Sequence, residues 1–193
     1  MATLAAFPEP MNVEAFLAFY DTRPDGEKWE LIDGELFMNA TPVIRHQKIV
    51  GNLIFALGLA RRQSGGQWDA LPGIGVRLSD FSFVEPDVMI RPLDDLRSHI
   101  CDDIIVAFEV LSPSTRGHDL GFKRANYATL PSLTHYVVIS PEQPEVRVFA
   151  RHAGWSEEVL NKLDASIQFE GLDVALALRD IYADMTAWFK ISN

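Results

Sequence analysis

The chain has 193 residues, of which 48% are hydrophobic and 23% charged, which is typical of a globular protein with a substantial core. The formal net charge of −10 argues against a protein that simply coats nucleic acid, because phosphate contacts need Lys and Arg, although carboxylates that bind a metal would add to such a charge. The single cysteine, Cys101, excludes an internal disulfide and a zinc site made of cysteines.

The N-terminal part of the chain predicts a helix, a hairpin and a second helix. A short helix is expected at residues 12–20, where apolar residues recur at helical spacing. Asp33 and Gly34 separate two apolar-rich runs and favour a type I′ turn, so residues 28–39 are predicted to form a β-hairpin. An apolar stripe predicts a long helix at residues 45–63, followed by a Ser-Gly-Gly stop.

The rest of the chain predicts mainly β-structure. Three strands are expected at residues 68–78, 83–90 and 103–112, then a helix at about 118–129, a strand at 134–140, and a hairpin from residues 145–150 and 155–161. The stretch 172–184 combines alternation with a short helical pattern.

In chain order these elements predict an α/β (mixed α+β) fold. A helix, three strands, a helix and a strand form the core, with helices on the faces of the sheet, an N-terminal hairpin and C-terminal strand additions. We expect residues 1–27 to form a helix and loop that pack on one domain at residues 28–184, with a tail at 185–193.

Glu109 lies within the most apolar of the predicted strands, at residues 104–111. An ionised carboxylate that is buried there needs a partner, because an unpaired buried charge is very costly. A bound metal ion and a buried ion pair with a basic residue of another element both meet this need, and both interpretations remain open.

Asp87 lies in another apolar run, where an Asp disfavours the strand and needs a reason. Glu85 precedes it by two residues and would share its face of a regular strand, although Pro86 can bend the chain there. Neighbouring strands that each bring a carboxylate would supply the oxygen ligands that Mg²⁺ prefers. The alternative is an Asp that caps a turn at the strand end.

Asp119, Lys123 and Tyr127 are spaced by four residues and lie along one face of the helix predicted at 118–129. This face either points to the acidic end of the sheet or carries a solvated Asp-Lys pair that contributes about a few tenths of a kcal/mol. In the first case the lysine could orient or deprotonate a water molecule, or stabilise charge on a phosphate.

Other catalytic motifs do not occur in the sequence. It contains no GxxxxGK[ST] phosphate loop, no GxSxG elbow and no HExxH pair. The five histidines show no ligand spacing, and His46 is of interest because it begins the long helix.

Several short motifs follow one another in an order that is typical of one family. They are Glu30-Leu31-Ile32-Asp33-Gly34-Glu35-Leu36, His46-Gln47, Glu85-Pro86-Asp87-Val88, Phe108-Glu109-Val110-Leu111-Ser112-Pro113-Ser114-Thr115, and Asp119-Leu120-Gly121-Phe122-Lys123 with Tyr127. In combination they resemble the Uma-type restriction endonucleases, within the PD-(D/E)XK nuclease superfamily. The resemblance covers about residues 29–182.

The resemblance implies a restriction-endonuclease-like fold in which Asp87 is the first acid of the superfamily motif and Glu109 the second. The superfamily's lysine usually stands two residues after the second acid, a position that Leu111 occupies here. The resemblance implies that Lys123, on the following helix, takes its place. Seven further residues are expected to support the site: Glu30, His46, Glu85, Ser112, Ser114, Asp119 and Tyr127.

The implied reaction is hydrolysis of a phosphodiester in DNA. Asp87 and Glu109 would hold one or two Mg²⁺ or Mn²⁺ ions, and Lys123 would assist the attacking water. Two copies related by a two-fold axis would suit cleavage of both strands. The N-terminus lacks a signal-peptide pattern, and no apolar run approaches the ~20 residues that cross a bilayer, so a cytoplasmic protein without a membrane partner is expected.

Two other functions remain open from the sequence. One is a catalytically inert binding module on the same fold, in which Asp87 and Glu109 merely pair with lysines; the acidic charge and the displaced lysine favour it. The other is a metal-dependent phosphodiesterase that acts on a small nucleotide, a substrate that the negative charge suits better than DNA; the sequence does not distinguish DNA from RNA as the substrate of a nuclease.

Overall fold

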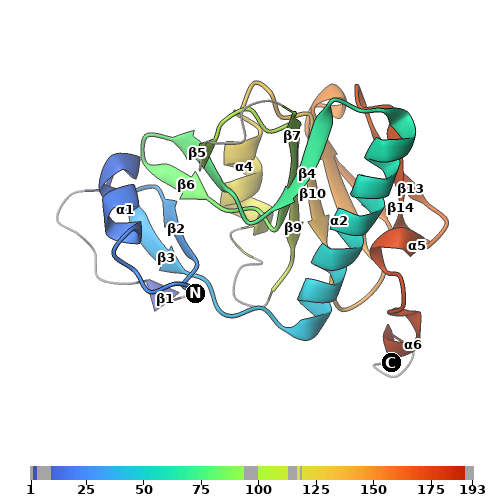
Figure 1. Ribbon diagram of the computed structural model, residues 1–193, viewed down its shortest axis with the longest axis horizontal. Coiled ribbons are helices and arrows are strands. Elements are labelled where there is room, and N and C mark those ends of the chain that lie inside the picture. The colour runs from blue at the N-terminus through green and yellow to red at the C-terminus, as the bar shows by residue number, and fades with distance from the viewer. Residues whose placement is uncertain (1, 4–9, 94–99, 113–116, 118, 190–193) are drawn as a thin grey trace.

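The computed structural model describes residues 2–3, 10–93, 100–112, 117 and 119–189 (Figure 1). Its helices are α1 (Val13–Tyr20), α2 (Ile44–Ser64), α4 (Arg124–Tyr127), α5 (Leu178–Ile181) and α6 (Thr186–Phe189), with a π-helix η1 (Asp119–Lys123) and a 3-10 helix η2 (Arg151–Ala153). Its strands are β1 (Ala2–Thr3), β2 (Trp29–Ile32), β3 (Glu35–Met38), β4 (Trp68–Pro72), β5 (Gly75–Ser79), β6 (Ser82–Val84), β7 (Val88–Pro92), β8 (Ile100–Cys101), β9 (Val106–Val110), β10 (His135–Ile139), β11 (Val146–Ala150), β12 (Glu157–Leu160), β13 (Ser166–Phe169) and β14 (Val174–Ala177).

The central sheet has the strand order β12-β11-β10-β9-β7-β4. Strands β9 and β10 pair in parallel, whereas β7 pairs antiparallel with both β4 and β9. In chain order, α2 is followed by β4, β7 and β9, then by the η1–α4 helical segment and β10. The predicted core of helix, three strands, helix and strand is therefore confirmed.

A second sheet, of order β1-β3-β2-β6-β5-β8, lies beside the central one, and β13 and β14 form a separate hairpin (Figure 1). Two of the predicted strands were wrong in extent, because each is divided between the two sheets. The run 68–78 turns at Gly73, whose φ is +59°, and the run 83–90 is interrupted around Pro86, which cannot donate a ladder hydrogen bond. Because the strands are interrupted at these two positions, each of the two runs contributes one strand to each sheet.

The helix predicted at 118–129 is shorter and less regular. A five-residue π-helix is followed by one turn of α-helix that ends at Tyr127, and residue 118 lies outside the described residues. The C-terminal stretch resolves into β14 and α5. The expected tail contains α6, where the Phe189 ring lies 5.6 Å from that of Tyr182.

Two apolar clusters flank the central sheet. The cluster beneath α2 takes Val106, Phe108 and Val110 from β9, whereas the cluster on the opposite face takes Ala107 from the same strand together with Tyr127. All five residues of β9 are buried, as expected for a central strand that is covered on both faces. The alternation places Glu109 on the Ala107 side, where α4 and the second sheet pack.

The β2–β3 hairpin that carries Glu30 has the predicted turn. Asp33 and Gly34 have φ values of 49° and 82°, as a type I′ turn requires at both positions. Helix α2 ends as predicted at Gly65, which is left-handed with a φ of 70°. Among the described residues, no helix is long and apolar enough to cross a membrane.

Candidate functional site

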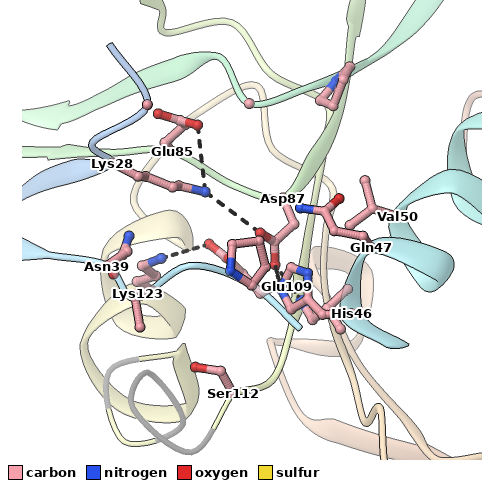
Figure 2. A pocket seen from close by; sticks show the side chains of 16 residues that line it. Lys28, Asn39, His46, Gln47, Val50, Glu85, Asp87, Glu109, Ser112 and Lys123 are labelled. Atoms are coloured by element: carbon pink, nitrogen blue, oxygen red, sulfur yellow. Dashed lines mark hydrogen bonds and ion pairs between the residues drawn. The ribbon is translucent and has the colours of Figure 1, made fainter. Parts of the chain in front are cut away.

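A cavity of about 310 Å³ opens beside the first turn of α2, where the β2–β3 hairpin approaches β7 and β9 (Figure 2). Six of the residues that the sequence singled out line it: His46, Glu85, Asp87, Glu109, Ser112 and Lys123. Residues that are far apart in the sequence are thus brought to one place by the two sheets and α2.

Asp87 stands directly before β7, in the interruption between β6 and β7 rather than within a strand. The register of β7 and β9 pairs Val88 with Phe108, and one step further places Asp87 across from Glu109. The backbone N–H of Val110 donates to Oδ2 of Asp87 at 2.8 Å, and Nε2 of His46 lies 3.1 Å from the same oxygen. Strand pairing and the start of α2 therefore fix this carboxylate.

The surroundings of Asp87 favour its ionised form. Burial by itself raises the pKa of this carboxyl, but the hydrogen bond to His46, the charge of Lys28 and the N–H of Val110 outweigh it and lower the pKa. Asp87 is therefore an anion at neutral pH, although it is largely shielded from water.

Glu109 lies opposite the helical segment and is 3% exposed. Its Oε1 lies 3.0 Å from Nζ of Lys123 and 3.5 Å from the hydroxyl of Tyr127, which donates to it. Burial, together with the neighbouring acids Asp119 and Asp87, raises the pKa of Glu109 well above its usual value despite Lys123. The buried ion pair that was one interpretation of Glu109 is present, and it forms in the wall of the cavity.

Lys123 is bound by three carboxylates. Its ammonium lies 2.9 Å from Oε1 of Glu30, 3.0 Å from Glu109 and 3.5 Å from Asp119, and its side chain is 3% exposed. Burial alone would lower the pKa of Lys123, but these acids raise it well above its usual value. The predicted contact between Asp119 and Lys123 is therefore made in a buried cluster and not as a solvated pair.

Glu30 enters the site from the second sheet and is fully buried. Its Oε1 accepts the backbone N–H of Glu85 at 2.9 Å in addition to Lys123, whereas its Oε2 has no hydrogen-bond partner among the described residues. Burial raises the pKa of Glu30, but Lys123, Lys28 and the N–H of Glu85 together lower it below its usual value. Glu30 thus ties the second sheet to the helical segment through one lysine.

Glu85, Ser112 and Asp119 are the other predicted site residues that the structure describes. Glu85 lies outside the strands, but it lines the cavity and its Oε1 lies 3.6 Å from Nζ of Lys28. Ser112 lines the cavity, whereas Ser114 lies outside the described residues. The backbone oxygen of Asp119 accepts a hydrogen bond from Tyr136 at 2.9 Å, which anchors the π-helix to β10.

Lys28 is the residue that the sequence reasoning missed. It precedes β2, lines the cavity, and places its ammonium 3.6 Å from both Glu85 and Asp87 (Figure 2). Burial lowers the pKa of Lys28, but Asp87 and Glu85 raise it above its usual value. A signal was available, since Lys28 stands two residues before Glu30 and would share its side of an extended chain.

The charges of this site fit a divalent cation. Among the described residues, five carboxylates (Glu30, Glu85, Asp87, Glu109 and Asp119) lie within 4 Å of the ammonium groups of Lys28 and Lys123. No group of three or more His, Cys, Asp or Glu side chains is arranged to hold a metal within the part of the chain that the structure describes. Mg²⁺ requires only one or two carboxylates, with water and substrate phosphate as its other ligands, so two acids at the cavity suffice.

Comparison with known proteins identifies the family of this chain. The sequence profile described as "Uma2: Putative restriction endonuclease" matches residues 13–179. A solved structure of a "putative nuclease belonging to DUF820" from Anabaena variabilis ATCC 29413 superposes with a TM-score of 0.76 at 15% identity, over 93% of this chain and 99% of the other. No curated protein matches the sequence. The structural match shows a shared fold, and the profile, which spans most of the chain, shows that the protein belongs to the Uma2 family.

Proposed function

We propose that the protein is a metal-dependent endonuclease that hydrolyses phosphodiester bonds in DNA. Membership of a family named for restriction endonucleases supports a nuclease role. The observation that carries the proposal is the meeting of Asp87 and Glu109, from paired segments of the central sheet, in the wall of one cavity.

Asp87 and Glu109 would hold one or two Mg²⁺ or Mn²⁺ ions. When bound, such an ion polarises a phosphoryl oxygen and lowers the pKa of a water ligand. His46 and the N–H of Val110 both contact Oδ2 of Asp87, which leaves Oδ1 as the oxygen that is free of these two contacts. Because both contacts come from regular elements, the carboxylate is held in one orientation before any ligand arrives.

Lys123 would serve the reaction through Glu109. Its ammonium is almost fully buried and bound by carboxylates, so we assign it the role of a positioning residue that orients Glu109 and favours its ionised form. Glu30 and Asp119 in turn hold Lys123, and Tyr127 provides a second contact to Glu109. On this proposal Lys123, which contacts Glu109 from the helical segment, takes the place of the lysine that the superfamily pattern puts on the strand.

The reaction joins the oxygen of water to phosphorus, breaks the bond between phosphorus and the leaving sugar oxygen, and transfers a proton to that oxygen. The substrate is a polyanion and the cavity is acidic, so bound metal is also needed to let the phosphate approach. Two-fold pairing of the chain, which light scattering would detect, would present two such cavities to the two strands of a duplex.

A cleavage panel tests the proposal. Purified protein is incubated with supercoiled plasmid, single-stranded DNA, RNA and bis(p-nitrophenyl) phosphate, each with Mg²⁺, Mn²⁺ or EDTA. We expect plasmid cleavage with either metal and none with EDTA. Cleavage of the small diester or of RNA alone would replace DNA as the substrate, and no cleavage of any substrate, with no Mn²⁺ binding by calorimetry, would favour the inert binding module.

A further inference from the structure

The two lysines of the site differ in what their ammonium groups can reach. The side chain of Lys123 is 3% exposed and its ammonium is within 3.0 Å of both Glu30 and Glu109. The side chain of Lys28 is 31% exposed, and its two acidic neighbours, Glu85 and Asp87, lie at 3.6 Å. These longer distances exceed a direct hydrogen bond, so the N–H groups of Lys28 are not committed to the acids beside them.

The backbone of Lys28 is fixed although its side chain reaches into the cavity. The carbonyl oxygen of Lys28 accepts the N–H of Asn39 at 2.8 Å, which continues the β2–β3 pairing by one step. On one side, the carbonyl oxygen of Glu27 accepts the hydroxyl of Tyr20, and on the other Trp29 is 3% exposed. A long cationic side chain therefore projects from a fixed point, with Asp87 as one of its neighbours (Figure 2).

A phosphodiester that enters this cavity meets an excess of negative charge. Three basic side chains, Lys28, His46 and Lys123, belong to the described residues that line the cavity. His46 uses Nε2 on Asp87, while its Nδ1 is buried without a hydrogen-bond partner among those residues. Lys123 is enclosed by its acids. Lys28 is thus the cation that can offer hydrogen bonds to a phosphate from within the cavity.

We propose that Lys28 is a catalytic residue, whose ammonium binds a non-bridging oxygen of the scissile phosphate and stabilises the negative charge that develops there. This inference rests on the nuclease function proposed above. Lys28 remains protonated throughout and transfers no proton, so it acts by charge and hydrogen bonding alone.

In this role Lys28 would have two successive partners, first the acids beside it and then the phosphate. Without metal, its charge offsets Glu85 and Asp87. Asp87 and Glu109 would hold a divalent cation whose charge would neutralise these acids in place of Lys28, and the ammonium of Lys28 would then be able to bind the phosphate. Removing a competing cation from beside Asp87 does not weaken metal binding on this account, which separates Lys28 from a residue that only supports the metal site.

The test compares Lys28→Gln and Lys28→Arg with the wild type, and with Lys162→Gln, which changes an exposed lysine after β12. We expect Lys28→Gln to lower kcat for plasmid cleavage about 100-fold or more, the usual effect of losing one donor to a developing charge. Mn²⁺ affinity by calorimetry should be unchanged or higher. Lys28→Arg should recover part of the rate, and Lys162→Gln should match the wild type.

Two outcomes would overturn the role of Lys28 and leave the nuclease in place. Lys28→Gln could cleave as fast as the wild type, or its loss of rate could be matched by an equal loss of Mn²⁺ affinity. The first would show that no contact to the phosphate is needed, and the second that the lysine acts on the metal site.

If the wild type cleaves nothing, the proposed function fails, but a binding measurement can still test whether Lys28 contacts a phosphate. Fluorescence anisotropy of a labelled DNA duplex in Ca²⁺, which also takes oxygen ligands, should then show weaker binding by Lys28→Gln. Its log Kd against log salt should have a slope smaller by about 0.9, as for one lost phosphate contact. Equal affinities and slopes, or no binding by either protein, would overturn the contact.

Discussion

The ammonium nitrogen of Lys123 lies 3.0 Å from Oε1 of Glu109, and both side chains are at most 5% exposed. The lysine comes from a π-helix and the acid from the centre of the sheet, so one ion pair joins the two layers at the wall of the cavity. The same pair connects the stability of the fold to the candidate site.

Removal of Lys123 should destabilise the protein strongly. Lys123→Met leaves Glu30, Glu109 and Asp119 buried around an apolar side chain, and breaking a buried pair in this way costs about 3–5 kcal/mol. Urea unfolding measures the change. The matched control is Lys48→Met, because Lys48 pairs with Asp184 at the surface, where a pair contributes about 1 kcal/mol or less. Equal effects of the two substitutions would contradict a special role for the buried cluster.

Loss of His46 should leave the carboxylate of Asp87 less firmly oriented. Its Nε2 is 3.1 Å from Oδ2 of Asp87, and removing a group that orients a metal ligand typically lowers metal affinity about 10–100-fold. We expect His46→Ala to bind Mn²⁺ more weakly by calorimetry, with an unchanged far-UV circular dichroism spectrum. Gln63→Ala, at an exposed position near the other end of α2, should bind as the wild type does, and a normal affinity of His46→Ala would argue against Asp87 as a ligand.

His135 should make the protein less stable in mildly acidic solution. Burial, and then the nearby His152, lower the pKa of His135 below its usual value. The unfolded chain therefore takes up this proton first as the pH falls, so the free energy of unfolding is at its full value above the unfolded pKa of about 6.5 and falls below it. His135→Gln should reduce this loss between about pH 7.5 and pH 5 in urea titrations.

The exposed His152 is the control for that measurement. His152→Gln removes only the second cause of the low pKa of His135, after burial, and should change the slope less than His135→Gln does. If the free energy of unfolding of His135→Gln depends on pH as that of the wild type does, the pKa of His135 does not differ between the folded and unfolded states.

The turn at Gly34 should tolerate no side chain. A Cβ there would lie 2.4 Å from Cβ of Pro10, and its φ is +82°. Gly26 shares the positive φ, at +91°, but a Cβ at that position would meet nothing within 4 Å. We expect Gly34→Ala to lower the free energy of unfolding by about 1–3 kcal/mol more than Gly26→Ala, the usual cost of an overpacked contact. Equal losses of unfolding free energy in the two variants would mean that the cost comes from the positive φ and not from the contact with Pro10.

Most of the core could be predicted from the sequence because its signals are local. The apolar run around Glu109, the Asp33-Gly34 turn and the glycine that ends α2 each depend on neighbours in the chain, and the structure confirms them. The order of helix, three strands, helix and strand was predicted from local signals of this kind along the chain.

The arrangement of the site depends on contacts between distant segments, which the sequence pattern does not contain. The division of two predicted strands between two sheets rests on how β5 and β6 pair, and that division brings Glu85 beside Lys28. The burial of Lys123 likewise depends on Glu30, which lies on another sheet. Lys28 was missed because a lysine before a strand is ordinary until the pairing of that strand is known.

In the proposed function, Asp87 belongs to the centre that cleaves phosphodiesters. The most direct measurement is the rate of plasmid cleavage in Mg²⁺ by Asp87→Asn, an isosteric change that removes the charge, beside Asp164→Asn at an exposed position. We expect Asp87→Asn to be slower by about 10–100-fold or more, since loss of even a group that supports a metal ligand has an effect of this size. Its thermal unfolding temperature should stay within a few degrees of the wild type, and Asp164→Asn should match the wild type. Cleavage by Asp87→Asn at the wild-type rate would contradict the account.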